Sequence, residues 1–136
     1  MNASSSLQRA IYELLIDDPS VLNILGGPEV YEHVPRKAPF PYVVFGPSRA
    51  RDWSTSTEAG DEHSLSLRVW TRGGGKLENA EIIAVIRSVL NASDLTVEDH
   101  HLVNLLHESS EIRREPDGET YRGVVRYRAV TEPVLV

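Results

Sequence analysis

The sequence predicts an α+β fold: an antiparallel sheet with a long C-terminal hairpin and helices packed on one face. Two segments, 7–16 and 76–90, repeat apolar residues at helical spacing. Two β-rich arms, 101–115 and 120–131, flank a strong turn signal and predict an antiparallel hairpin. Because helices and strands do not alternate strictly, segregated layers are favoured over a parallel sheet. A length of 136 residues indicates one domain, residues 1–136.

Two helices are expected at the N-terminus. The first spans residues 7–16, and its apolar residues share one helical face: Leu7, Ile11, Leu14 and Leu15. Ser5 followed by Gln8 has the pattern of a capping box for this helix. A short second helix begins at Pro19, with Asp18 as its cap, and ends at the glycine pair that starts with Gly26.

Extended segments follow these helices. Residues 30–33 are a weak strand or an extended link, and prolines hold the next stretch extended. Residues 42–45 are apolar throughout, which predicts a strand buried on both faces. Residues 47–62 are polar without a clear period and are expected to form a loop. Residues 65–69 alternate apolar and polar side chains, which predicts a half-buried strand.

Glycines at 73–75 end this strand and precede the helix expected over residues 76–90. Residues 95–97 predict a further short strand. The C-terminal hairpin turns at residues 115–119, where a proline presets one backbone angle and a glycine accepts a positive one. The polar tip of the hairpin, residues 111–122, is expected to project in part beyond the core.

Composition excludes several function classes. Hydrophobic residues make up 40% of the chain and charged residues 25%, which indicates a folded domain with a core. The absence of cysteine excludes disulfides and thiolate metal sites, and it fits a reducing compartment. The first six residues lack the features of a signal peptide, and no apolar run approaches the ~18 residues of a membrane span. No membrane partner is therefore expected.

Charge points to a protein partner. The net charge of −6 opposes nonspecific adhesion to nucleic acid. Twelve of the fourteen basic residues are arginine, and five of them fall in the last 24 residues. A solvated strand face would explain this clustering as well as an interface does. Arginine pairs with carboxylates through its planar fork and tolerates interfaces better than lysine, so the pattern favours protein over DNA.

No motif has the pattern of a catalytic or cofactor site. The glycines before Lys76 lack the second spaced glycine and the Ser or Thr of a phosphate-binding Walker loop. His100 and His101 would point to opposite faces of a strand, which does not suit a zinc site. Adjacent carboxylate pairs rarely converge on one cleft, and no serine sits in a nucleophile elbow. No catalytic residue, cofactor or metal is therefore predicted.

The candidate site is instead a surface. Trp53 lies in a charged loop, where it is either an interface anchor or a side chain that packs the loop onto its own body. Trp70 is expected to cover the edge of the core. The candidate subunit or partner interface comprises Arg49, Arg51, Asp52, Trp53, Arg72, Arg113, Arg114, Arg122, Arg126 and Arg128.

A series of short motifs runs through residues 7–130. The motifs are Pro41-Tyr42-Val43-Val44 after a proline-bearing loop, Asp52-Trp53, Gly60-Asp61-Glu62-His63, Val69-Trp70-Thr71-Arg72, Val89-Leu90-Asn91, Leu95-Thr96-Val97, and Asp117-Gly118 leading to Tyr121 through Tyr127. Each is weak alone, but their order and spacing are specific together. In this respect the chain resembles the tail terminator (tail completion) proteins of siphophage-like bacteriophages and gene transfer agents.

The resemblance implies a small α+β domain that assembles as a homo-hexameric ring on the tail tube. Such a ring stops tube polymerisation, contacts tail tube protein on one side and presents its other side to a head-completion (stopper) protein. It also implies that DNA passes through the lumen without sequence-specific binding, that assembly occurs in the bacterial cytoplasm, and that the protein ends in the neck of the particle. Two alternatives stay open: another tail or neck component and, less favoured, a small enzyme.

Overall fold

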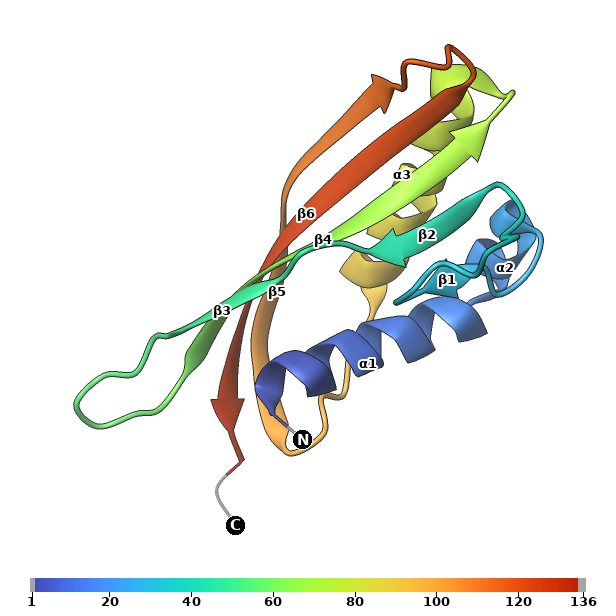
Figure 1. The fold of residues 1–136 in the computed structure, drawn as a ribbon. Coiled ribbons are helices and arrows are strands. Elements are labelled where there is room, and N and C mark those ends of the chain that lie inside the picture. The colour runs from blue at the N-terminus through green and yellow to red at the C-terminus, as the bar shows by residue number, and fades with distance from the viewer. Residues whose placement is uncertain (1, 135–136) are drawn as a thin grey trace.

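A computed structural model describes residues 2–134 of the chain. Within this range three helices cover one face of a six-stranded sheet (Figure 1). In chain order the elements are α1 (Ala3–Asp17), α2 (Pro19–Leu25), β1 (Val30–Tyr31), β2 (Tyr42–Phe45), β3 (Arg49–Asp52), β4 (Asp61–Arg72), α3 (Gly75–Ala92), β5 (His100–Arg114) and β6 (Thr120–Pro133). The predicted α+β class, with helices on one face and a long C-terminal hairpin, is confirmed.

The sheet has the strand order β1-β2-β4-β6-β5. Long β4 pairs with β6 along its whole length, from Asp61↔Thr131 to Arg72↔Thr120. The opposite edge of β4 carries β2 at one end and β3 at the other. Because the two-residue β1 runs parallel to β2, the sheet is mixed, which corrects the prediction of an antiparallel sheet in this detail.

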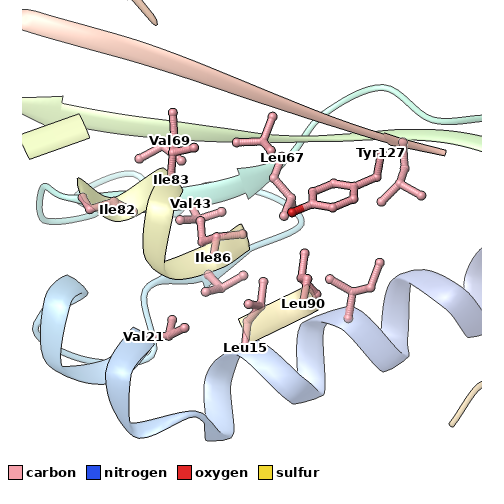
Figure 2. Close-up of a cluster of buried hydrophobic side chains, with 14 of the residues drawn as sticks. Leu15, Val21, Val43, Leu67, Val69, Ile82, Ile83, Ile86, Leu90 and Tyr127 are labelled. Atoms are coloured by element: carbon pink, nitrogen blue, oxygen red, sulfur yellow. The ribbon is translucent and has the colours of Figure 1, made fainter. Parts of the chain in front are cut away.

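The core lies between the helices and the covered face of the sheet, as Figure 2 shows. Leu67 from β4 and Val43 from β2 lie in one cluster with Ile82 and Ile86 of α3 and with Leu15 of α1. All five side chains are at most 1% exposed. Burying one such side chain contributes about 1.5–3 kcal/mol to folding. The apolar periodicity read in the sequence therefore corresponds to the packed faces of these elements.

The helix ends are set by local caps. Helix α1 begins earlier than expected, because Asn2 is its N-cap and accepts a hydrogen bond from the backbone N–H of Ser5 at 2.8 Å. The predicted capping box at Ser5 and Gln8 is therefore wrong. Asp18 caps α2 as predicted, and Gly26 ends it with a φ of 78°. Among the described helices, none is long and apolar enough to cross a membrane.

Asn79 ties α3 to the sheet at one buried point. It is 0% exposed, and its Nδ2 donates to the backbone carbonyl of Val69 at 2.9 Å and to Thr71 Oγ1 at 3.2 Å. Gly123 on β6 makes this approach possible, because a Cβ there would overlap Asn79 Oδ1 and lie 2.9 Å from Ile83 Cδ1. The helix thus approaches the sheet closely at a position where the strand has no side chain.

Three sequence predictions about extended segments need correction. Residues 42–45 do form a strand, but only Val43 is buried, because β2 has helices on one face only. Residues 95–97 are not a strand, although Val97 is 3% exposed and belongs to the core. Residues 47–62 are not a plain loop, because they contain β3 and the start of β4.

The tip of the C-terminal hairpin does not project freely. The N–H of Gly73 donates to the carbonyl of Glu119 at 3.1 Å, which holds the tip beside the loop between β4 and α3. The segment that extends away from the body is the β3–β4 hairpin, visible at the lower left of Figure 1. We refer to residues 49–64 as the arm and to residues 54–59 as its tip.

Candidate interface on the helix-free face of the sheet

One face of the sheet has no helix over it, and strand alternation decides which side chains point there. Along β4, residues 65, 67 and 69 face the helices, so residues 64, 66, 68, 70 and 72 face the other way. The pairing register then assigns Arg122, Arg126 and Arg128 of β6 to the same side. We call this side the open face.

The open face collects most of the chain's arginines. Its register places eight arginines there: Arg49, Arg51, Arg68, Arg72, Arg113, Arg122, Arg126 and Arg128. Seven of these were predicted interface residues, so strand pairing brings together positions that are up to 79 residues apart. Asp52 and Arg114 alternate to the other side, and Trp53 lies at the edge of the open face against Arg128.

Glu62 is the centre of an arginine cluster at one end of this face. Its two carboxylate oxygens accept hydrogen bonds from Arg51 Nε and Arg128 Nε, both at 2.7 Å. The hydrogen bonds from Arg128 and then Arg51 lower the pKa of Glu62, so it stays ionised. Two guanidinium groups share one carboxylate, and the cluster therefore keeps a net positive charge.

The other end of the open face is paired more loosely. Arg72 lies 3.8 Å from carboxylates of Asp117 and Glu119, and its guanidinium lies 4.3 Å from the centre of the Phe40 ring. Asp117 organises this turn, because it accepts hydrogen bonds from Thr120 and Glu119, and the bonds from Thr120 do most to lower its pKa. Long ion pairs at exposed positions contribute little stability, so Arg72 can exchange these partners for others at little cost in free energy.

The remaining two ion pairs on this face follow the same pattern. Arg122 lies 3.5 Å from a carboxylate oxygen of Glu115, and Arg126 lies 3.7 Å from one of Glu111. Among residues 2–134, Arg49, Arg68 and Arg113 make no ion pair at all. A hollow of ≈ 330 Å³ is lined by serines of β4 and by four arginines and two glutamates: Arg49, Arg68, Arg122, Arg126, Glu108 and Glu111. The surplus of arginine around this hollow suits an acidic protein surface.

Exposed apolar side chains accompany the arginines. Trp53 is 51% exposed, with its ring centre 5.6 Å from the Arg128 guanidinium carbon, so it does not pack into the body as a core residue does. Leu106 and Val103 on β5 are 54% and 44% exposed. Tryptophan and arginine are the residues most enriched at energetic hot spots of protein interfaces, and lysine is depleted there. The open face has this composition.

Residues with catalytic chemistry are dispersed rather than gathered. His63 is buried under the sheet with a ring nitrogen 2.9 Å from Thr131 Oγ1, and burial is the main cause that lowers its pKa. Burial raises the pKa of Tyr127, also on the covered face, to about 12. Within residues 2–134, no group of three or more metal-ligating side chains comes together. The arrangement suits recognition of a surface.

Comparison with known proteins identifies the family. A family model described as tail completion protein gp17 matches residues 9–132. The chain belongs to this family. Membership gives this tail completion protein a structural role in the tail of a phage-like particle, and it points away from an enzyme.

Individual relatives agree with this assignment. The tail completion protein gp17 of Bacillus phage SPP1 is 25% identical over 126 residues, covering 93% of this chain and 92% of the relative. A chain in the virion of a native gene transfer agent particle superposes with a TM-score of 0.86 at 29% identity, covering 96% of this chain and 97% of that one. The structure of bacteriophage SPP1 gp17 superposes with a TM-score of 0.63 at 21% identity, over 98% and 91% of the two chains, and supports the fold.

The sequence reasoning missed three members of the open face. Arg68 and Trp70 occupy the polar positions of the alternating strand, and that alternation was signal enough to include them. Trp70 also stacks with an arginine, since the Arg122 guanidinium carbon lies 5.9 Å from its ring centre. Glu62 gave no such signal, because its segment was read as a loop.

Proposed function

We propose that this protein caps the tail tube as a ring of six copies, stops polymerisation of the tube and joins the tail to the head connector. In this proposal residues 1–136 act as a single tail terminator domain, docked on tail tube protein on one side and on a head-completion protein on the other. Assembly takes place in the bacterial cytoplasm, and the ring ends in the neck of the particle.

The observation that carries this proposal is the open face. A net charge of −6 is combined with one sheet face that gathers eight arginines and exposes Trp53 and Leu106. A subunit with one helix-covered face and one charged face offers two different surfaces to its partners, and head-to-tail contacts between identical copies are those that close into rings. The acidic surplus elsewhere keeps DNA from adhering as it passes through the lumen.

Deletion of the gene tests the role in the particle. We expect free heads together with tails of uncontrolled length, because nothing ends the tube or presents it to the connector. Electron micrographs of the lysate give head–tail joining and the distribution of tail lengths. Joined particles with tails of normal length would contradict the proposal.

A labelled copy tests the position. We expect the label at the neck, between head and tail tube, in micrographs of intact particles. A label at the distal end of the tail would instead favour the alternative, a different structural component of the tail.

A further inference from the structure

The arm ends in a tip that extends away from the body of its own subunit (Figure 1). Every residue from 54 to 59 is exposed, yet hydrogen bonds fix the loop. Thr55 N–H donates to the carbonyl of Glu58 at 2.7 Å, Thr55 Oγ1 accepts from Glu58 N–H at 3.0 Å, and Ser54 Oγ accepts from Gly60 N–H at 3.1 Å. A loop that is shaped in advance loses little entropy when it docks.

A groove elsewhere on the subunit has room for such a tip. It lies between α1 and the edge strands β1 and β2, with a volume of ≈ 570 Å³. Tyr12, Tyr31 and Phe45 form aromatic walls, Ser5 and Arg9 supply polar groups from α1, and Glu32 adds one acidic side chain. No helix, strand or loop within residues 2–134 fills this space.

The tip and the groove share one favourable pairing of charges. The tip consists of two serines, two threonines, Glu58 and Ala59, so its only charge is negative. Two charged side chains line the groove, Arg9 and Glu32, and Arg9 is the one that attracts the tip. Within residues 2–134, the ion pair of Arg9 is with Glu13, one helical turn away, at 3.1 Å with both side chains mostly exposed. An exposed pair of this kind contributes little, so Arg9 is available to a second carboxylate. Small hydroxyl residues fit a groove whose walls are aromatic and whose rim is polar.

The tip cannot enter the groove of its own subunit. Ser48 lines the groove and is followed directly by β3, whose register with β4 carries the tip away from it. A tip that seats in this groove would therefore come from a second copy. Contact between two different patches of identical chains is head-to-tail, and it closes into a ring when the rotation per subunit is right.

We infer that the arm tip of each subunit seats in the α1–β1 groove of the next copy around the ring, with Glu58 facing Arg9. This inference deepens the proposed function and rests on it. It assigns the contact between subunits to the arm and the groove, which leaves the open face for other proteins of the tail and neck.

Cross-linking in particles tests the contact. The chain has no cysteine, so Ala59→Cys at the tip and Ser5→Cys in the groove introduce unique thiols into it. Both positions are exposed and do not disturb the core. Particles that carry a tagged double variant are treated with a short bismaleimide, and the tag is followed on a denaturing gel. We expect a ladder of covalent oligomers ending at the closed ring, whereas each single variant should stay monomeric on the gel.

The outcomes separate this inference from the proposed function. If imaging shows a ring at the neck but the double variant gives no ladder, the ring closes through other surfaces and the inference is wrong. If the particles contain no ring at the neck, the proposed function fails as well. Covalent dimers formed by Ala59→Cys alone would mean that tips meet each other, which again overturns the inference.

A charge exchange gives an independent test. Because like charges that meet in an interface are strongly unfavourable, we expect Glu58→Arg alone, and Arg9→Glu alone, to lower the yield of joined particles by at least about tenfold. The double variant Glu58→Arg with Arg9→Glu restores opposite charges and should recover most of the yield. Equal yields for the two single variants and the double variant would show that these residues do not face each other.

Discussion

The two faces of the sheet are built from alternate residues of the same strands, but one face packs the core and the other faces solvent. On β4, Leu65, Leu67 and Val69 face the helices and are buried, whereas Ser64 and Arg68 face outward. The covered face is stabilised by apolar packing against helices of the same chain. The open face is held by ion pairs that are long or shared, and it is not covered by any element within residues 2–134.

Substitutions on the two faces should therefore have different effects. Antiparallel sheets commonly leave one face in water, but such a face is usually a mixture of polar residues. Here it concentrates arginine and exposes Trp53 and Leu106. We therefore expect changes on the covered face to alter folding and changes on the open face to alter assembly.

Matched leucines give the largest contrast in stability. Leu67 is 0% exposed on the covered face and Leu106 is 54% exposed on the other side of the sheet. Leu67→Ala should lower the free energy of unfolding by about 2–5 kcal/mol, because it removes buried methyl groups and leaves a cavity. Leu106→Ala should change it by no more than about 0.5 kcal/mol. Urea unfolding of the purified proteins measures both, and similar losses would contradict the assignment of faces.

The buried amide of Asn79 gives the next largest effect. Asn79→Ala removes the hydrogen bonds that Asn79 Nδ2 donates to the carbonyl of Val69, to Thr71 Oγ1 and to the carbonyl of Tyr121, and it leaves a cavity at a buried site. We expect a loss of about 1–3 kcal/mol in the free energy of unfolding. Asn91→Ala, at an exposed position of the same helix, is the control and should be nearly neutral. Equal unfolding midpoints in urea would show that Asn79 does not hold α3 on the sheet.

The elements that build the covered face were predicted well from the sequence, because local patterns of residues determine them. Apolar spacing locates α1 and α3, and Asp18 and Gly26 mark the ends of α2 by their own backbone and side-chain chemistry. The error at the start of α1 arose because two residues, Asn2 and Ser5, suit an N-cap equally well. Which of them caps the helix depends on where α1 packs, which local pattern does not encode.

The open face was predicted only in part, because it depends on pairing between distant strands. Arginines from β3, β5 and β6 were proposed as one interface, although Arg113 and Arg114 are neighbours on a predicted strand and therefore face opposite sides. Asp52 gave no such signal, because its segment was read as a loop. The arm was missed for a related reason. Its β3 residues are all exposed and carry no apolar pattern, so only their pairing with β4 makes them a strand.

The pH dependence of stability tests the buried position of His63 on the covered face, and we expect a smaller effect than for the substitutions above. Burial lowers the pKa of His63 on the covered face, and the nearby charge of Asp61 opposes part of that shift. The unfolded chain, with a histidine pKa of about 6.5, therefore binds a proton before the folded protein does. The stability that neutral His63 provides is present above about pH 6.5 and is lost as the pH falls below that value toward the folded pKa.

Urea unfolding midpoints at pH 7.5 and pH 5.5 measure how steeply the stability of the folded protein falls with pH, which we call the slope. His63→Gln should flatten it, and His101→Gln, an exposed histidine on the open face, should leave it unchanged. Part of the slope should persist in His63→Gln, because burial also lowers the pKa of His107. The lowered pKa values of Asp52, Glu62 and Asp117 act in a more acidic range and do not enter this window. An identical slope in His63→Gln and the unsubstituted protein would rule out the effect.

Charge reversal on the open face should have the smallest effect on folding and a large one on assembly. Arg126 is half exposed and lies 3.7 Å from Glu111, so Arg126→Glu should change the free energy of unfolding by less than about 1 kcal/mol. Arg126→Lys keeps the charge, and Arg87→Glu reverses an exposed charge on the helical side. If the open face docks on an acidic partner, Arg126→Glu should lower the yield of joined particles, whereas Arg126→Lys and Arg87→Glu should not.

Two outcomes would contradict this prediction. Normal joining by Arg126→Glu would show that this residue is not part of the interface. Equal defects in Arg126→Glu and Arg87→Glu would show that net charge, rather than the open face, controls assembly.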